Sequence, residues 1–306
     1  MKTSLLPVTL LLVTGFASLS IHPAGFEHAL QAAPLARINT PEQPRQDPNR
    51  PRLNVRDYGA RGNGVQDDTR AIQAAINAAP ATGAIIYFPA GTYISNNFQV
   101  TNKNGLTFEG DGFTSVIKRP PLPGNTRIAT IENSNDMFFR NIAFDENGIT
   151  HFGGINLYGV HRVRIENTRH FDSRPWSLAE GGGDHYSWLF QGFIAPGGGV
   201  IANEDITIVN NLIEDLTFEM NYVTRGLVEG NTMRRPYFGF GTFSAAFNAE
   251  VGGPGVQTED LVVRNNTIVD PLGSAIAIHL DPGSDINSSF RRILIANNRI
   301  RMGRQV

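Results

Sequence analysis

The sequence contains no cysteine in its 306 residues, so no disulfide bond contributes to its fold. It also lacks a stripe of one charge, because 26 Lys and Arg residues face 28 Asp and Glu residues, with both signs scattered along the chain. Nucleic acids and acidic membrane surfaces need a basic patch, so we expect neither as a partner. After residue 21 no apolar run is long enough to cross a bilayer.

The first residues carry one long apolar run. Lys2 is followed by "TSLLPVTLLLVTGFASLSI", and small residues that suit a signal peptidase follow in "HALQAAPLA". We interpret residues 1–33 as a signal peptide, which predicts a secreted or periplasmic/extracellular protein that is free of the membrane after cleavage. The alternative is an uncleaved anchor, since Ser4 to Ile21 is near the minimum length for a span.

Residues 34–52 contain five prolines among polar residues and are predicted to form an extended linker. Residues 53–306 are then the folded domain. Its last predicted strand, around Ile300, is followed by no capping segment, so we expect either an open end or a natural protein that is longer.

Many glycines and prolines separate short runs rich in Val, Ile and Phe, a pattern that predicts strands. Residues 69–79 are the exception, because Ile72, Ala75, Ile76 and Ala79 have helical spacing. Asp67 or Asp68 would start this helix and accept hydrogen bonds from its free N–H groups. We do not interpret the two aspartates as a catalytic pair, because neighbours on an extended segment point to opposite faces.

One short pattern recurs: an apolar residue, any residue, an apolar residue, any residue, then Asn or Gly. Seven copies end at Gly110, Asn141, Asn167, Asn210, Gly230, Asn265 and Asn297. Each copy predicts a strand and a sharp turn, and the varying spacing leaves room for loops of different length. The series predicts a solenoid whose coils stack and share one core, with helix 69–79 covering the open end.

Asparagine also follows the patterned position in four copies, at Asn211, Asn231, Asn266 and Asn298. Stacked amides at these positions would hydrogen-bond from coil to coil. The alternative is a set of independent turn asparagines that face water.

The run "NVRDYGARGNGVQDDTRAIQAAINAAPATGAIIYFPAGTY", Asn54 to Tyr93, resembles the N-terminal signature of the pectate lyase superfamily, which includes rhamnogalacturonase-like and epimerase-like domains and phage tailspikes. The resemblance implies an all-β fold, a right-handed parallel β-helix with a short N-terminal capping α-helix, and action on acidic or complex polysaccharides. It does not name a reaction, because the Gly-His-Gly motif of polygalacturonases and the Tyr-Gly-x-Asp-Pro-His motif of alginate epimerases are absent; "HLDPGSD" is the nearest fragment. Many pectate lyases use calcium, so Ca²⁺ is a candidate cofactor, although no Asp-rich cluster has suitable spacing.

In such folds the resemblance places the site on the outward face of the strands that precede the patterned strands. Alternation there turns Glu219 and His279 outward, two coils apart, and we interpret them as the main catalytic candidates. Asp281 and Glu250 lie near the ends of neighbouring strands and join them. Substrate-binding candidates on the same face are Asn156, Tyr158 and Asn221. For each residue alone, an ordinary solvated side chain is the alternative.

The loop at residues 173–199 concentrates Trp176, Tyr186 and Trp188. Aromatic rings stack on sugar rings, so these residues, with Arg174, are predicted to form one wall of a glycan groove. The alternative is a small hydrophobic core over the coil.

These features predict an exported protein that acts on a uronic-acid-containing polysaccharide as a lyase, a hydrolase or a C5-epimerase. His279 would take the C5 proton in a lyase or epimerase, whereas a hydrolase would use Glu219 with Asp281. The alternative is a non-catalytic β-helix, an adhesin or glycan-binding module. The sequence gives no oligomeric state.

Overall fold

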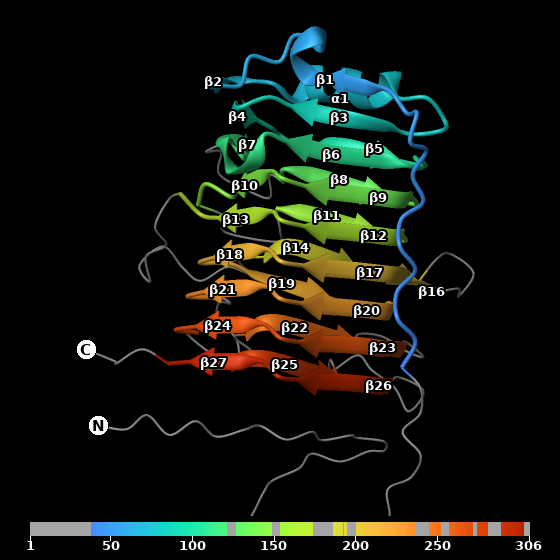
Figure 1. The fold of residues 1–306 in the computed structure, drawn as a ribbon, viewed down its shortest axis with the longest axis vertical. Coiled ribbons are helices and arrows are strands. Elements are labelled where there is room, and N and C mark those ends of the chain that lie inside the picture. Colours follow the sequence, from blue (N-terminus) through green and yellow to red (C-terminus); the bar gives the residue numbers. More distant parts are fainter. Residues whose placement is uncertain are drawn as a thin grey trace, which may run out of the picture.

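The chain winds into a stack of coils built on three parallel sheets (Figure 1). The computed structural model describes residues 38–120, 127–148, 154–173, 186–191, 193–194, 200–236, 245–251, 257–271, 274–280 and 289–302. From β5 onward, each coil contributes one strand to each sheet, and the chain passes from sheet C to sheet A and then to sheet B. The predicted solenoid is confirmed as a parallel β-helix. The predicted signal peptide, residues 1–33, lies outside the described residues.

The strands within each sheet follow one another in chain order. Sheet A contains β1 (Arg52–Asn54), β3 (Ala84–Phe88), β6 (Leu106–Gly110), β9 (Asn135–Arg140), β12 (His161–Glu166), β17 (Asn203–Val209), β20 (Val223–Glu229), β23 (Gln257–Arg264) and β26 (Ser289–Ala296). Sheet B contains β2 (Asn63–Asp67), β4 (Gly91–Ile94), β7 (Ser115–Lys118), β10 (Ala143–Asp145), β13 (Arg169–Phe171), β18 (Leu212–Glu214), β21 (Thr232–Arg234), β24 (Thr267–Val269) and β27 (Arg299–Arg301). Sheet C contains β5 (Phe98–Thr101), β8 (Ala129–Glu132), β11 (Ile155–Tyr158), β14 (Tyr186–Gln191), β19 (Thr217–Met220), β22 (Ala245–Val251) and β25 (Ser274–Leu280).

Smaller elements complete the described part. They are the 3₁₀ turns η1 (Val55–Tyr58) and η2 (Gly112–Thr114), the helix α1 (Thr69–Ala78), and an antiparallel pair, β15 (Phe193–Ile194) with β16 (Val200–Ile201). No helix of the described residues is long and apolar enough to cross a membrane.

The recurring sequence pattern marks the turn from sheet A to sheet B. Its final asparagines, at positions 141, 167, 210, 265 and 297, have left-handed backbone angles with φ between 49° and 57°. Asparagine tolerates this conformation better than other residues with a side chain. The predicted amide ladder is also present, because Asn231 donates from Nδ2 to Oδ1 of Asn266 at 3.0 Å and accepts from Nδ2 of Asn211 at 2.9 Å.

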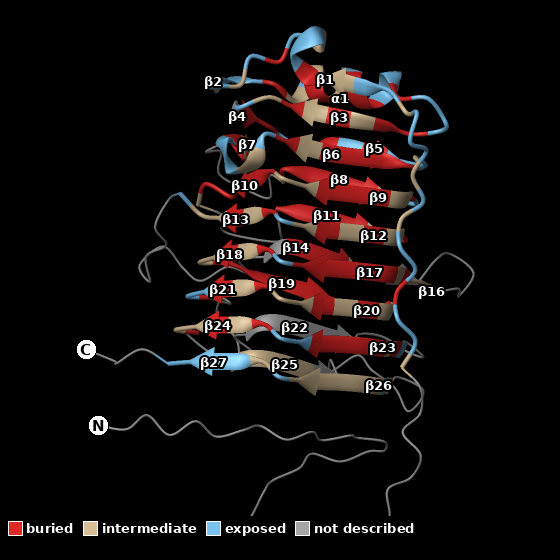
Figure 2. Cartoon of the chain, viewed as in Figure 1, coloured by how far each residue is buried: buried red, intermediate tan, exposed pale blue. Residues whose placement is uncertain are grey.

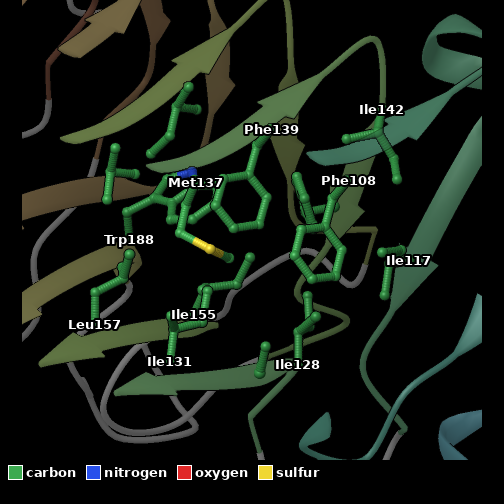
Figure 3. Packing of buried hydrophobic residues seen from close by; sticks show 14 of the residues in the cluster. Phe108, Ile117, Ile128, Ile131, Met137, Phe139, Ile142, Ile155, Leu157 and Trp188 are labelled. Carbon is green, nitrogen blue, oxygen red and sulfur yellow. The ribbon is translucent and has the colours of Figure 1, made fainter. Parts of the chain in front are cut away.

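The core lies between the three sheets (Figures 2 and 3). Phe108 stacks on Phe139 with ring centroids 4.9 Å apart, and Phe139 meets the edge of Trp188 at 4.8 Å. Because coils repeat at about 4.8 Å, side chains at matching positions stack directly on one another. The apolar positions of the repeat therefore form one continuous core.

The helix α1 lies at the N-terminal end of the stack (Figure 1), and Ile72, Ala75 and Ile76 are buried in the core. The two aspartates at its start have different partners. Asp67 accepts from the N–H of Thr69, as a capping residue does, whereas the carboxylate of Asp68 accepts from the N–H groups of Arg61 and Gly62 in the preceding loop. The side chain of Asp68 thus stabilises the preceding loop and does not cap the helix.

Residues 38–51, which we call the strap, run along the outward side of sheet A from the level of β23 to β3 (Figure 1). Their side chains and backbone bond to distant coils: Asn39 contacts Asp260, Gln43 contacts Thr207, and Gln46 contacts Thr107. The proline-rich segment is extended, and it is held against the stack.

Candidate functional site

The outward face of sheet C carries a row of polar side chains. In the strand register Asn156 pairs with Thr130 on one side and Leu189 on the other, and Leu189 pairs with Glu219. Asn156 and Glu219 are therefore two coils apart, about 10 Å at the usual strand spacing. The alternate positions Ile155, Leu157, Phe218 and Met220 belong to the core.

The carboxylate of Glu219 is buried, with 2% of the residue exposed. Asn221, two residues further along the same side of the chain, donates from Nδ2 to Oε1 of Glu219. A carboxylate that is held by an amide has a fixed orientation, which a general acid or base requires.

Asn156 is also buried, and its side-chain carbonyl oxygen Oδ1 accepts no hydrogen bond from the described residues. Its Nδ2 donates to the hydroxyl of Tyr158 at 3.2 Å. Leaving a buried carbonyl oxygen without a donor costs about 1 to 3 kcal/mol. A ligand hydroxyl that bonded Oδ1 would recover that free energy.

The backbones of Glu250 and His279 are register partners in β22 and β25, one coil apart. Their strands follow β19, so His279 lies two coils from Glu219, as the sequence predicts. Of Tyr186 the structure describes the backbone, in β14. Asp281, Trp176 and Arg174 lie outside the described residues.

Trp188 is placed differently from the expectation. It is 1% exposed, lies in register with the core positions Ile155 and Phe218, and donates from its indole N–H to Nε2 of His170 at 2.7 Å. The register shifts between Tyr186 and Trp188, which brings the tryptophan to an inward position. This burial corrects the expectation that Trp188 lines a groove and favours the alternative of an aromatic core. Burial also lowers the pKa of His170 to about 3, so this histidine is neutral.

A second buried acid, Glu146, could not be recognised from the sequence. Its carboxylate is fully buried and packs against Gly154, directly before β11, and no donor among the described residues reaches either oxygen. Burial raises the pKa of Glu146 well above its usual value; the charge of Arg119 opposes this shift, while Asp172 and Asp145 add to it. Arg119 itself donates from Nε to the backbone carbonyl of Glu146 at 2.8 Å.

The resemblance suggested calcium as a cofactor. The side chains in the described part of the chain do not form a calcium site. There, no three His, Asp or Glu residues lie close enough together to hold a metal ion. Asp145, next to Glu146, is paired with Lys118 at 3.0 Å. We therefore derive no step through a metal.

These features define a right-handed parallel β-helix with a polar face on sheet C. Residues 52–151 match the family described as "Rhamnogalacturonase A/epimerase, pectate lyase-like", which confirms the resemblance inferred from residues 54–93 and identifies this part of the chain as a pectate lyase-like domain.

Three similar proteins illustrate the range of relatives. Mannuronan C5-epimerase AlgE1 of Azotobacter vinelandii is 63% identical over 59 residues, which are 19% of this chain and 4% of the epimerase. Plasmin and fibronectin-binding protein A of Streptococcus pneumoniae is 26% identical over 171 residues, 38% of this chain and 24% of that protein. The crystal structure of a hyperthermoactive exopolygalacturonase from Thermotoga maritima covers 86% of this chain and 70% of its own, with a TM-score of 0.57 and 13% identity. This chain thus spans a small part of the two sequence relatives, and the enzyme structure shows the shared fold.

Proposed function

We propose that the protein is an exported carbohydrate-active enzyme that acts on a uronic-acid-containing polysaccharide, bound across the coils on the outward face of sheet C. One observation carries the proposal: the fixed carboxylate of Glu219 lies two coils from the unpaired Oδ1 of Asn156. The mannuronan epimerase and the exopolygalacturonase support a substrate of this class by the names they carry.

The chemistry that suits this face is removal of the C5 proton of a uronate. His279 takes the proton as general base and becomes an imidazolium. In a lyase the electron pair left on C5 forms a C4=C5 double bond, and the glycosidic oxygen leaves from C4 and gains a proton. In an epimerase a proton returns to C5 from the opposite face. Glu219, on the other side of the sugar, would deliver the proton in either reaction.

The test is incubation with alginate, polygalacturonate and rhamnogalacturonan, followed by three readouts. Ultraviolet absorbance reports unsaturated ends, reducing-end assays report hydrolysis, and proton NMR reports epimerised uronate. Glu219→Gln and His279→Gln should each lower turnover by about a hundredfold. Glu229→Gln is the matched control on sheet A, where the glutamate pairs with Arg264 at the surface, and it should leave turnover unchanged. Full turnover in the Glu219 and His279 variants would refute this site.

A non-catalytic binding module is the second candidate function. The similarity to plasmin and fibronectin-binding protein A, over 171 residues, favours it. Binding of a glycan or protein without any of the three chemical changes would support this candidate over the enzyme.

A further inference from the structure

A column of alternating acids and bases crosses the outward side of sheet A. It has one residue in each of six consecutive strands, β9, β12, β17, β20, β23 and β26. All six have left-handed backbone angles, with φ between 52° and 61°, so each strand bulges at the same point. We call this set the Asp–Arg column: Asp136, Arg162, Asp205, Arg225, Asp260 and Arg292.

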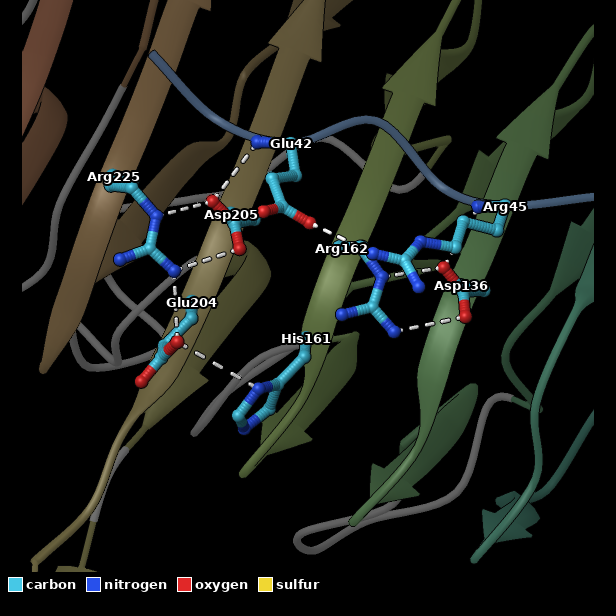
Figure 4. Close-up of polar contacts among 8 residues, drawn as sticks. All are labelled: Glu42, Arg45, Asp136, His161, Arg162, Glu204, Asp205 and Arg225. Carbon is cyan, nitrogen blue, oxygen red and sulfur yellow. Dashed lines mark hydrogen bonds and ion pairs between the residues drawn. The ribbon is translucent and has the colours of Figure 1, made fainter. Parts of the chain in front are cut away.

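Within the column, each aspartate is bonded by the arginine of the following coil, and Figure 4 shows the pairs Asp136–Arg162 and Asp205–Arg225. Arg225 donates from Nε to Oδ1 of Asp205 at 2.6 Å and from Nη2 to Oδ2 at 2.8 Å. Arg162 clamps Asp136 and Arg292 clamps Asp260 in the same two-pronged way. The charges cancel in pairs, so the column does not attract a partner by net charge. What remains is a set of fixed carboxylate oxygens that face the strap.

The strap bonds the three aspartates at regular intervals. The backbone N–H of Arg45 donates to Oδ1 of Asp136 at 2.8 Å, and the backbone N–H of Glu42 donates to Oδ1 of Asp205 at 3.0 Å (Figure 4). Asn39, three residues earlier again, donates from Nδ2 to Asp260 at 2.8 Å. Donors therefore recur at every third residue, and acceptors at every second coil.

The two repeats have the same length. Three residues of an extended, polyproline-like segment cover about 9.3 Å. Two coils cover about 9.6 Å at the usual strand spacing. The strap can therefore continue along the stack and keep its hydrogen bonds, which an ordinary strand, with its two-residue period, cannot do.

The sequence of the strap fits this rule. Pro41 and Pro44 directly precede the donors Glu42 and Arg45, and they favour the extended conformation. The next donor in the series would be residue 48, but Pro48 has no N–H, and the strap turns there, where the N–H of Arg50 bonds the carbonyl of Asp47. The hydrogen bonds from the strap to the aspartates of the column end with Arg45, before Pro48.

We propose that the Asp–Arg column is a peptide-binding site that selects an extended, proline-containing segment with a donor at every third residue. The strap is its built-in ligand, and the same peptide binds when it is supplied as a separate molecule. Selection rests on the backbone N–H groups of Glu42 and Arg45 and on the side-chain amide of Asn39, so the N–H of Glu42 matters more than its carboxylate. This site is on sheet A and is independent of the polysaccharide proposal for sheet C.

The test uses the full chain with a protease recognition sequence inserted between Pro48 and Asn49, in the exposed turn. After cleavage, an excess of a fluorescent peptide of residues 38–48 should exchange into the site and raise the fluorescence anisotropy. A peptide with Glu42→Pro, which lacks one N–H, should bind at least tenfold more weakly. Two matched peptides, Thr40→Pro and Glu42→Ala, should bind within about threefold of the original. Asp205→Asn in the protein should weaken binding of the original peptide.

Failure of the original peptide to bind, or equal binding of the Glu42→Pro and Thr40→Pro peptides, would overturn the proposal. A second measurement needs no cleavage. In the intact chain, hydrogen exchange should be slower at the amides of Glu42 and Arg45 than at those of Thr40 and Gln43. Equal exchange at the four amides would also overturn it.

Discussion

The backbone N–H of Glu42 donates to Oδ1 of Asp205 at 3.0 Å, although 163 positions of sequence separate the two residues. In a stack of coils most contacts join neighbouring coils, so cooperation between distant coils is weak. The strap adds contacts that pass over several coils at once.

The value of this contact can be measured with two matched aspartates. Asp205 and Asp215 both have left-handed backbones and both bond an arginine with two prongs, but Asp215 is exposed and has no contact with the strap. Asp205→Ala should lower the free energy of unfolding by about 2 kcal/mol more than Asp215→Ala, because the partly buried guanidinium of Arg225 and the backbone N–H of Glu42 both lose a buried carboxylate as partner. Chemical denaturation measures both, and equal losses would contradict the importance of the strap contact.

The capping role predicted for α1 is tested by burying a charge. Ile72→Asp and Ile76→Asp each place a carboxylate at a fully buried position and should cost several kcal/mol. Arg70→Asp, on the exposed side of the same helix, is the control and should melt like the wild type. Wild-type melting of both isoleucine variants would refute the cap.

His170 should make the protein sensitive to acid. Its pKa is about 3 in the folded chain and about 6.5 when unfolded, so the unfolded chain binds the proton first. The stability that depends on neutral His170 is complete above pH 6.5 and is lost as the pH falls toward 3. Between pH 7 and pH 4 the wild type should lose about 3 kcal/mol more than His170→Gln, as measured by urea unfolding at each pH. Equal losses in the wild type and in His170→Gln would contradict this prediction.

Glu146 should show the opposite dependence on pH. Its pKa is raised by burial, so it contributes stability below the unfolded value near 4.5, and that stability is lost as the pH rises through the folded value. Glu146→Gln cannot ionise. The stability of this variant relative to the wild type should therefore increase as the pH rises above 4.5. A constant difference would show that Glu146 is not titrating in a buried site.

Asn156 provides a binding test on sheet C. Asn156→Leu keeps the branching at Cγ and removes the unpaired Oδ1 together with the Nδ2 that donates to Tyr158, so affinity for the polysaccharide that proves to be the ligand should fall about five- to tenfold, the scale of one hydrogen bond. Affinity electrophoresis measures the change, and the melting temperature should stay close to that of the wild type. Unchanged affinity would place the ligand elsewhere.

The fold was accessible from the sequence because its rules are local. Alternation of apolar residues and a turn residue, Asn or Gly, recur from coil to coil, so the strands and the amide ladder could be predicted without knowing the loop lengths. The inward position of Trp188 could not be predicted from alternation, because one irregularity in β14 changes the side of the strand on which the indole lies.

The contacts of the strap also could not be predicted from the sequence. Its prolines predict an extended segment, but a free linker would have the same composition. Its partners Asp136, Asp205 and Asp260 are separated by unequal lengths of chain and become evenly spaced only when the coils are stacked. The burial of Glu146 likewise depends on how its turn packs against Gly154.

The direction of the strap determines which end of the stack of coils lies near the start of the described chain. Asn39 bonds Asp260 in β23, and the carbonyl of Pro51 accepts from the N–H of Ile85 in β3. The chain therefore runs along most of the stack before the first coil begins. Ile38, where the described part of the chain begins, consequently lies near β23, far from α1. A tether attached at Ile38 would hold the stack of coils beside β23 and present the end that carries α1 outward.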